Sequence, residues 1–137
     1  MDEELKLGPG TTLRVIAHDE HVLQLRATYA AGGAAPPAHL HPEQDERFEV
    51  LAGAMRNRIA GEDGELREGD VLEIGRGTAH QMWNAGDEPA VVDWRTTPAG
   101  RTLDWFRALS AVLAGQSTAD PAALLAEYGD VFRLVEE

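Results

Sequence analysis

Two glycine-bracketed segments of this 137-residue chain carry the side chains best suited to chemistry. The first reads Gly33-x5-His39-x-His41-x4-Glu46-x6-Gly53, and the second reads Gly69-x5-Gly75-x-Gly77-x2-His80-x3-Asn84. Together they supply three imidazoles and one carboxylate, which are nitrogen and oxygen ligands suited to a divalent transition metal. The pattern predicts a metal site formed by His39, His41, Glu46 and His80.

The spacing of the histidines is typical of β-strands. Residues two apart in a strand point to the same face, so His39 and His41 would present their rings on one side, with their backbones roughly 7 Å apart. His80 must come from a different strand, entered through the turn at residues 75–77. The second segment would therefore complete the site from across a barrel.

Asp45 is the competing carboxylate, one residue nearer to His41. Choosing Glu46 places the hydrophobic residues Phe48 and Val50 inward together with the ligand. Choosing Asp45 would instead turn two charged residues toward the core and bury unpaired charge. We therefore expect Glu46 to be the fourth ligand.

Two further side chains are candidates for contact with a substrate. Asn57 has the parity of its apolar neighbours, so its amide could project into a cavity; the alternative is a strand-end asparagine satisfied by backbone. Met82 would share a face with His80. His18 and His21 flank a predicted hairpin tip and are expected on the surface. The aromatic residues expected in the core or an interface, rather than as a binding platform, are Trp83, Trp94, Trp105 and Phe106.

Composition excludes several other classes of protein. A formal net charge of -12 repels phosphate backbones and anionic lipid, so neither nucleic acid nor membrane is an expected partner. Without cysteine there is no thiolate ligand or nucleophile. The single lysine, Lys6, lies in an N-terminal segment that we expect to be mobile, and no serine stands in a nucleophile elbow. Because no apolar run approaches a membrane span or a signal sequence, we expect a cytoplasmic location.

The chain divides into a strand-rich part, residues 1–98, and a helical extension, residues 99–137. Many short strands cut by turns, one of them at Asp63-Gly64, predict an all-β sandwich or barrel. We expect the extension to pack on the barrel or on a second subunit. The strands are predicted at 12–17, 22–29, 37–41, 46–52, 54–60, 71–74, 79–84 and 90–96.

The extension carries the periodicity and end signals of two helices. Apolar residues recur at helical spacing over residues 103–113, and Gly115 is a suitable stop. A second helix should begin with Asp120 as N-cap and Pro121 at the first helical position, and end at Gly129.

The two motifs resemble those of the cupin superfamily, in which a glycine, H-x-H, a glutamate and a glycine are followed by a second glycine, a proline-x-glycine turn, a histidine and an asparagine. The resemblance covers residues 11–98, and Gly75 departs from it where the family usually has proline. It implies that His39, His41, Glu46 and His80 occupy the metal-ligand positions. It also implies a double-stranded β-helix, or jelly roll, here with short C-terminal helices, and commonly a homodimer.

The expected cofactor is one divalent transition metal per chain, whether Fe, Mn, Ni, Zn or Co, because the ligand types do not choose among them. Open coordination positions would allow a small organic substrate to bind the ion. We expect a metal-dependent enzyme, most often in this superfamily a dioxygenase, with Glu46 and His80 in the catalytic centre. The alternatives are a redox-neutral isomerase, cyclase or dehydratase with Glu46 or a metal-bound hydroxide as base, and a non-catalytic metal-containing small-molecule binding protein.

Overall fold

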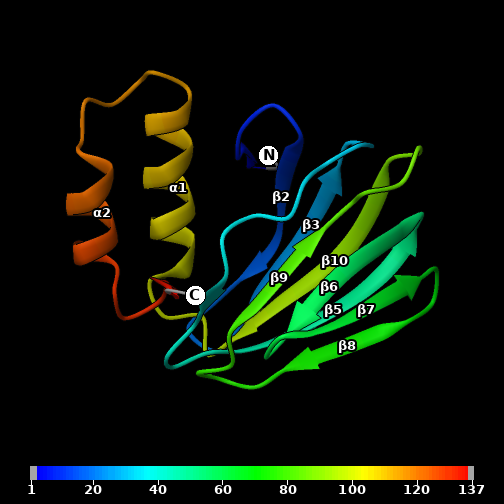
Figure 1. Ribbon diagram of the computed structural model, residues 1–137. Coiled ribbons are helices and arrows are strands. Elements are labelled where there is room, and N and C mark those ends of the chain that lie inside the picture. Colours follow the sequence, from blue (N-terminus) through cyan, green and yellow to red (C-terminus); the bar gives the residue numbers. More distant parts are fainter. Residues whose placement is uncertain (1–2, 136–137) are drawn as a thin grey trace.

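The computed structural model describes residues 3–135; residues 1–2 and 136–137 of the two predicted regions lie outside the described residues. Two antiparallel sheets face each other, and two helices lie beside them (Figure 1). This arrangement confirms the predicted all-β barrel with short C-terminal helices. The six-stranded sheet has the order β1 (Glu4–Lys6), β2 (Thr11–His18), β3 (Leu23–Tyr29), β10 (Ala90–Thr97), β5 (Asp45–Ala52) and β8 (Val71–Ile74). The five-stranded sheet has the order β11 (Arg133–Leu134), β4 (His39–Leu40), β9 (His80–Trp83), β6 (Ala54–Ile59) and β7 (Glu62–Arg67).

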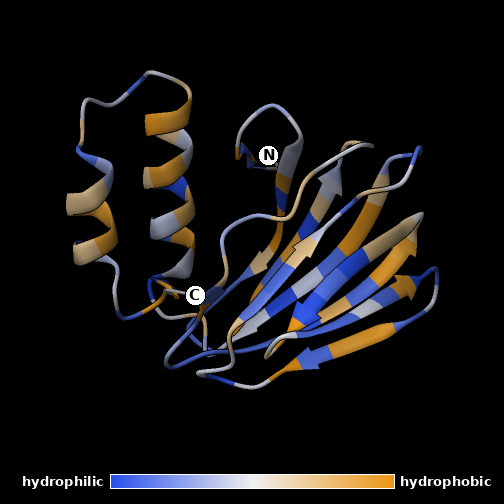
Figure 2. Ribbon diagram, in the orientation of Figure 1, coloured by the Kyte–Doolittle hydropathy of each residue, from blue (hydrophilic) through white to orange (hydrophobic). Residues whose placement is uncertain are grey.

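The strands fold as their alternation predicts. Along β5, Glu46, Phe48 and Val50 are buried, while Arg47 and Glu49 are only partly covered. Hydrophobic and hydrophilic residues alternate in this way along several strands, and both helices carry hydrophobic stretches (Figure 2). Burying one face of each sheet against the other supplies most of the free energy that holds such a barrel together.

One predicted turn is wrong. The chain reverses at Ala60-Gly61, where both residues have positive φ (49° and 86°), and not at Asp63-Gly64. Such a two-residue turn matches the twist of the strands it joins. Gly64 therefore lies within β7, opposite Asn57, and a Cβ built on Gly64 would come within 2.8 Å of the Asn57 side-chain oxygen.

Two short strands at the ends of the chain were not expected. Residues 4–6, predicted to be mobile, form β1, which pairs Leu5 with Leu13 of β2. Near the other end β11 pairs with β4, placing Leu134 opposite His39. The extension thus ends as a strand of the barrel rather than as a helix.

Both predicted helices are present. Helix α1 spans Thr102–Leu113 and is followed by Gly115 at a φ of 72°. Helix α2 spans Pro121–Glu127, and its N-cap carboxylate, Asp120, accepts a hydrogen bond from the backbone of Ala123 at 3.3 Å. Within residues 3–135, neither helix has the length and apolar character needed to cross a membrane. The buried apolar side chains of α1 belong to the same hydrophobic core as the barrel and are Leu103, Trp105 and Phe106.

Candidate metal centre

Three histidines from two neighbouring strands converge. His39 begins β4 and pairs directly with His80, which begins β9, while His41 follows β4. Their rings are 4.4 to 5.2 Å apart between centroids, and one nitrogen from each lies within 4.8 Å of the others. Such a cluster of imidazole nitrogens has the dimensions needed to hold a single ion.

Glu46 reaches the same point from the opposite sheet. Its Oε1 atom lies 3.0 Å from Nε2 of His41 and 3.1 Å from Nε2 of His80. All three of these atoms are buried, and although Oε1 lies 3.0 and 3.1 Å from the two nitrogens, none makes a well-aligned hydrogen bond within residues 3–135. Buried polar atoms left without partners are costly, so their convergence fits an ion that would satisfy them.

Hydrogen bonds from the Nδ1 atoms of His41 and His80 fix the orientation of these two rings. Nδ1 of His41 donates to the carbonyl of Val131 at 2.7 Å, and Nδ1 of His80 donates to the carbonyl of Thr78 at 2.9 Å. A proton held on Nδ1 leaves the lone pair of Nε2 directed at Glu46 and the shared point. These carbonyls therefore select the tautomer that a metal ligand needs.

The carboxylate is held in a comparable way. The indole Nε1 of Trp94 donates to Oε2 of Glu46 at 2.7 Å, which leaves Oε1 facing the histidines. Asp45 points away instead, where its half-exposed carboxylate pairs with Arg76 at 3.0 Å. The geometry thus brings Glu46, and not Asp45, to the three histidines.

The pKa values of the residues in the centre are shifted by burial and by the charges of the neighbouring histidines and Glu46. Burial raises the pKa of Glu46, but in the metal-free centre hydrogen bonds and positive charge from protonated His41 and His80 outweigh burial and lower that pKa to about 2. Burial, followed by the other two histidines, lowers the pKa of His39 to about 3. For His41 burial lowers the pKa, but the neighbouring Glu46 and the Val131 carbonyl raise it overall. Glu46 is therefore ionised near neutral pH, and His39 is neutral.

The three histidines open onto a cavity of about 640 Å³. Met82 lines this cavity, whereas Asn57 is buried but is not among the lining residues, so a substrate contact for either stays a prediction. The aromatic side chains in the lining are Tyr29, Phe48, Trp83, Trp94, Trp105, Phe106 and Phe132. Sequence reasoning placed some of these aromatics in the core and did not identify the cavity they line. His18 and His21 lie on the exposed surface, as predicted.

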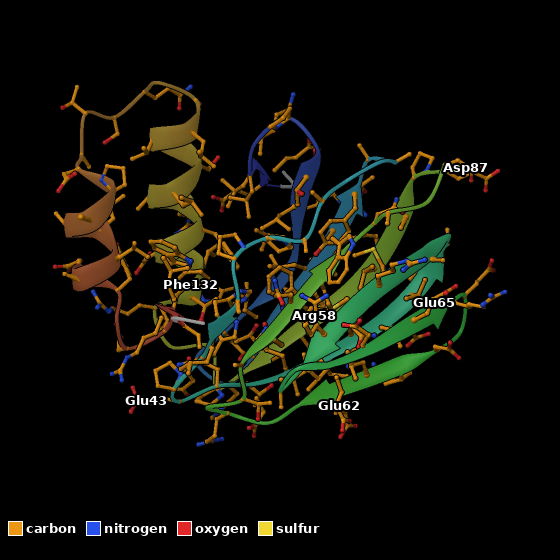
Figure 3. The ribbon with its side chains drawn as sticks, in the orientation of Figure 1. Glu43, Arg58, Glu62, Glu65, Asp87 and Phe132 are labelled. Atoms are coloured by element: carbon orange, nitrogen blue, oxygen red, sulfur yellow. The ribbon has the colours of Figure 1, made fainter. Side chains whose placement is uncertain are left out.

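The C-terminal extension forms part of this site. The Phe132 ring stacks on His39 at 4.7 Å and on Trp105 of α1 at 4.9 Å, and Figure 3 shows Phe132 beside the end of α1 that lies nearest the strands. Arg101 donates to both carboxylate oxygens of Asp130 at 2.6 and 3.0 Å, which anchors the chain just before Val131. No pattern of residue types indicates the contact to His41, because it comes from the backbone carbonyl of Val131.

Comparison with known proteins gives the same family for the chain. The chain is 32% identical to a germin-like protein, subfamily 2 member 1, of Arabidopsis thaliana over 109 residues, which are 74% of this chain and 47% of that protein. It is 31% identical over 68 residues to the tetracenomycin polyketide synthase protein TcmJ of Streptomyces glaucescens, covering 50% of this chain and 46% of that one. The chain thus spans less than half the length of these curated relatives.

A solved structure shares the fold. The structure of KdgF from Halomonas sp. superposes with a TM-score of 0.65 at 22% identity, covering 74% of this chain and 92% of that one. Residues 25–95, about half of the chain, match the family model described as the Cupin domain. With its paired sheets and its histidine cluster, this chain belongs to the cupin family.

Proposed function

We propose that this protein is a metal-dependent enzyme that acts on a small organic molecule, and specifically a non-haem metal dioxygenase. The observation that carries the proposal is the convergence of three unpartnered buried atoms, from His41, Glu46 and His80, beside a cavity of about 640 Å³. A bound divalent ion would supply Lewis acidity and, if redox-active, a site for O2 beside the substrate. The donors suit Fe, Mn, Ni, Zn or Co.

The protein's own residues have separable roles in this proposal. His39, His41, Glu46 and His80 would hold the ion. A carboxylate with a pKa of about 2 accepts protons poorly near neutral pH, which favours Glu46 as a ligand over Glu46 as a general base. Tyr29 lines the cavity, and burial, followed by the charge of Glu46, raises the pKa of its hydroxyl. Tyr29 therefore stays neutral and can donate a hydrogen bond to a substrate oxygen.

A redox-neutral isomerase, cyclase or dehydratase is the second candidate. The observation that favours it is the neutral Tyr29 hydroxyl beside the cavity, because a fixed hydrogen-bond donor can stabilise the negative charge that develops on a substrate oxygen during proton transfer. The third candidate is a metal-containing protein that binds a small molecule without turning it over.

One experiment separates these candidates. Apo protein is loaded separately with each of the five metals and offered enolic, aromatic and carboxylate compounds, while O2 uptake and products are followed. We expect O2 consumption in proportion to product with Fe(II), and its loss in His80→Ala but not in His18→Ala, a matched control at an exposed site. Anaerobic turnover with Zn(II) would instead identify the redox-neutral enzyme. Ligand binding without turnover in any metal form would identify the binding protein.

We also infer that the protein works in the cytoplasm as a homodimer, without nucleic-acid or membrane partners. The net charge of -12 supports the exclusion of polyanionic partners. Exposed apolar side chains supply surface that a second subunit could cover, and they are Ile16, Val71, Leu113 and Leu134.

A further inference from the structure

The cavity beside the metal centre differs in charge from a site for an anionic sugar. We infer that its substrate is a planar, polycyclic aromatic compound bearing phenol, enol or ketone oxygens, and not a sugar phosphate or another polyanion. This inference rests on the proposed function, since it names the substrate class of the same site.

Charge is the first line of argument. Within residues 3–135, no Lys, Arg, Asp or Glu lines the cavity; apart from the three histidines and the indole N–H groups of its tryptophans, its polar side chains are those of Thr11, Tyr29 and Asn84. Asn84 is already engaged, because its amide donates to the carbonyls of Tyr29 and Glu88 and its oxygen accepts from Gly86. Phosphate groups in proteins are held by Arg, Lys or rows of backbone N–H groups, and this wall offers no cationic side chain.

Arg58 is a basic residue close to this wall, but it faces other partners. Its guanidinium lies 5.8 Å from the centre of the Trp83 ring, donates to Asp63 at 2.6 Å and contacts Gln81 at 3.4 Å. It is not among the lining residues. The positive charge for a ligand must therefore come from the ion, whose two charges are reduced to one by the Glu46 carboxylate. One deprotonated ligand oxygen matches this balance, and a phosphate dianion does not.

Shape is the second, independent line of argument. Trp105, Phe132 and His39 form a continuous stack, with adjacent planes inclined by 28° and 23°. Trp94 and Phe106 stand edge to face, with their ring centres 5.3 Å apart, on the same cavity. A lining this rich in aromatic rings favours an aromatic ligand, which gains buried apolar area and contacts with the edges and faces of those rings.

Size is the third. Drug-sized ligands occupy pockets of about 300–1,000 Å³, so a cavity of about 640 Å³ accommodates fused rings and leaves a single ring poorly enclosed. The small residues of the segment between β3 and β4, such as Gly33 and Ala34, line the same space and leave it broad.

The test measures binding by calorimetry to protein loaded with Zn(II), so that no O2 chemistry intervenes. The probes are 2-naphthol, which cannot strip the ion by chelation, phenol and glucose 6-phosphate. We expect 2-naphthol to bind at least about tenfold more tightly than phenol, and glucose 6-phosphate to bind more weakly than either. Glucose 6-phosphate binding as tightly as 2-naphthol, or phenol equalling 2-naphthol, would overturn the inference.

Two variants locate the binding. Phe132→Leu removes the aromatic plane, keeps an apolar side chain and should weaken 2-naphthol binding, whereas Leu113→Ala, on the exposed face of α1, should leave it unchanged. Leu109 of α1 lines the cavity, and the larger side chain in Leu109→Trp would fill part of it. This variant should lose binding of 2-naphthol and keep binding of phenol. Zn content and circular dichroism are measured for each variant, and equal 2-naphthol affinity in all folded variants would place the ligand elsewhere and overturn the inference.

Failure of this inference is distinguishable from failure of the proposed function. If 2-naphthol binds as expected but no metal form turns over any aromatic compound, the enzyme proposal fails and the ligand class stands. If a sugar phosphate binds and is turned over, the metal-dependent enzyme stands and the ligand class fails.

Discussion

Replacing Trp94 with Phe would remove a single hydrogen-bond donor from the metal centre. The indole N–H of Trp94 donates to Oε2 of Glu46 at 2.7 Å, and both side chains are buried. Phe at this position keeps a ring in contact with Phe48 and Phe106, whose centroids both lie 5.3 Å from that of Trp94. The substitution therefore acts mainly through the carboxylate.

Two magnitudes can be worked out for this change. A hydrogen bond to a buried charged group contributes about 1.5–3 kcal/mol to the free energy of unfolding. Loss of a residue that orients a metal ligand weakens metal affinity about 10- to 100-fold, which corresponds to about 1.4–2.7 kcal/mol. The two quantities are independent, because the first reports the contact in the metal-free protein and the second reports how much the contact strengthens when the ion binds.

The chain offers a matched control in Trp105→Phe. Trp105 is also buried, but its Nε1 has no hydrogen-bond partner among the residues that the structure describes. Both variants lose the same atoms and keep a six-membered ring, which in Trp105→Phe can still pack on Phe132, so the difference between the variants reports mainly the bond to Glu46. Denaturant unfolding of the metal-free proteins and competition with a chromophoric chelator measure the two quantities. Equal stability and equal Zn(II) affinity in the two variants would refute the assigned role of Trp94.

Three further predictions concern the ligands and the turns. The pKa of His41 is raised, so protons compete with the metal ion for its ring nitrogen. Metal affinity should fall about tenfold per pH unit below that pKa and stay constant above it. A metal affinity that does not change between about pH 5 and 8 would contradict histidine ligation. Ala60 has a φ of 49°, and Ala60→Asn should raise stability by about 1 kcal/mol, seen as a higher melting temperature; a lower one would contradict the turn. In Gly64→Ala the new Cβ would lie 2.8 Å from the side-chain oxygen of Asn57, so the free energy of unfolding in urea should fall by about 1–3 kcal/mol. In the control Gly75→Ala the nearest atom to the new Cβ is 4.0 Å away, and the free energy of unfolding should stay unchanged.

The candidate centre could be predicted from sequence because its signals are local. His39 and His41 share a face through the two-residue period of a strand, and the parity of β5 separates Glu46 from Asp45 without any knowledge of the tertiary structure. His80 was predicted to come from a different strand across the barrel, and the second part is wrong, because β9 lies directly beside β4 in the same sheet and Glu46 is the residue that comes from the opposite sheet. The pairing of His39 with His80 confirms that these segments meet.

The turn between β6 and β7 shows where such reasoning fails. Both Ala60-Gly61 and Asp63-Gly64 are plausible turns, and Asp-Gly is the stronger local signal. The structure uses the weaker one, and in the resulting register Gly64 lies opposite Asn57, whose side-chain oxygen would be 2.8 Å from a Cβ on Gly64. The pairing of β6 with β7 thus outweighs local turn preference, and Ala60 adopts a positive φ.

The C-terminal segment has a further consequence for how the centre is built. β4 is only two residues long, so its own ladder restrains His39 and His41 weakly. The restraint comes from about ninety residues away, where Val131 accepts from His41, Phe132 stacks on His39 and Leu134 pairs with the backbone of His39. The stack onto Trp105 then joins these contacts to the hydrophobic core, so that packing of the extension and orientation of the ligands are stabilised together. A backbone carbonyl and a two-residue strand leave no mark in residue types, which is why the extension could be predicted as helices but not as a wall of the metal centre.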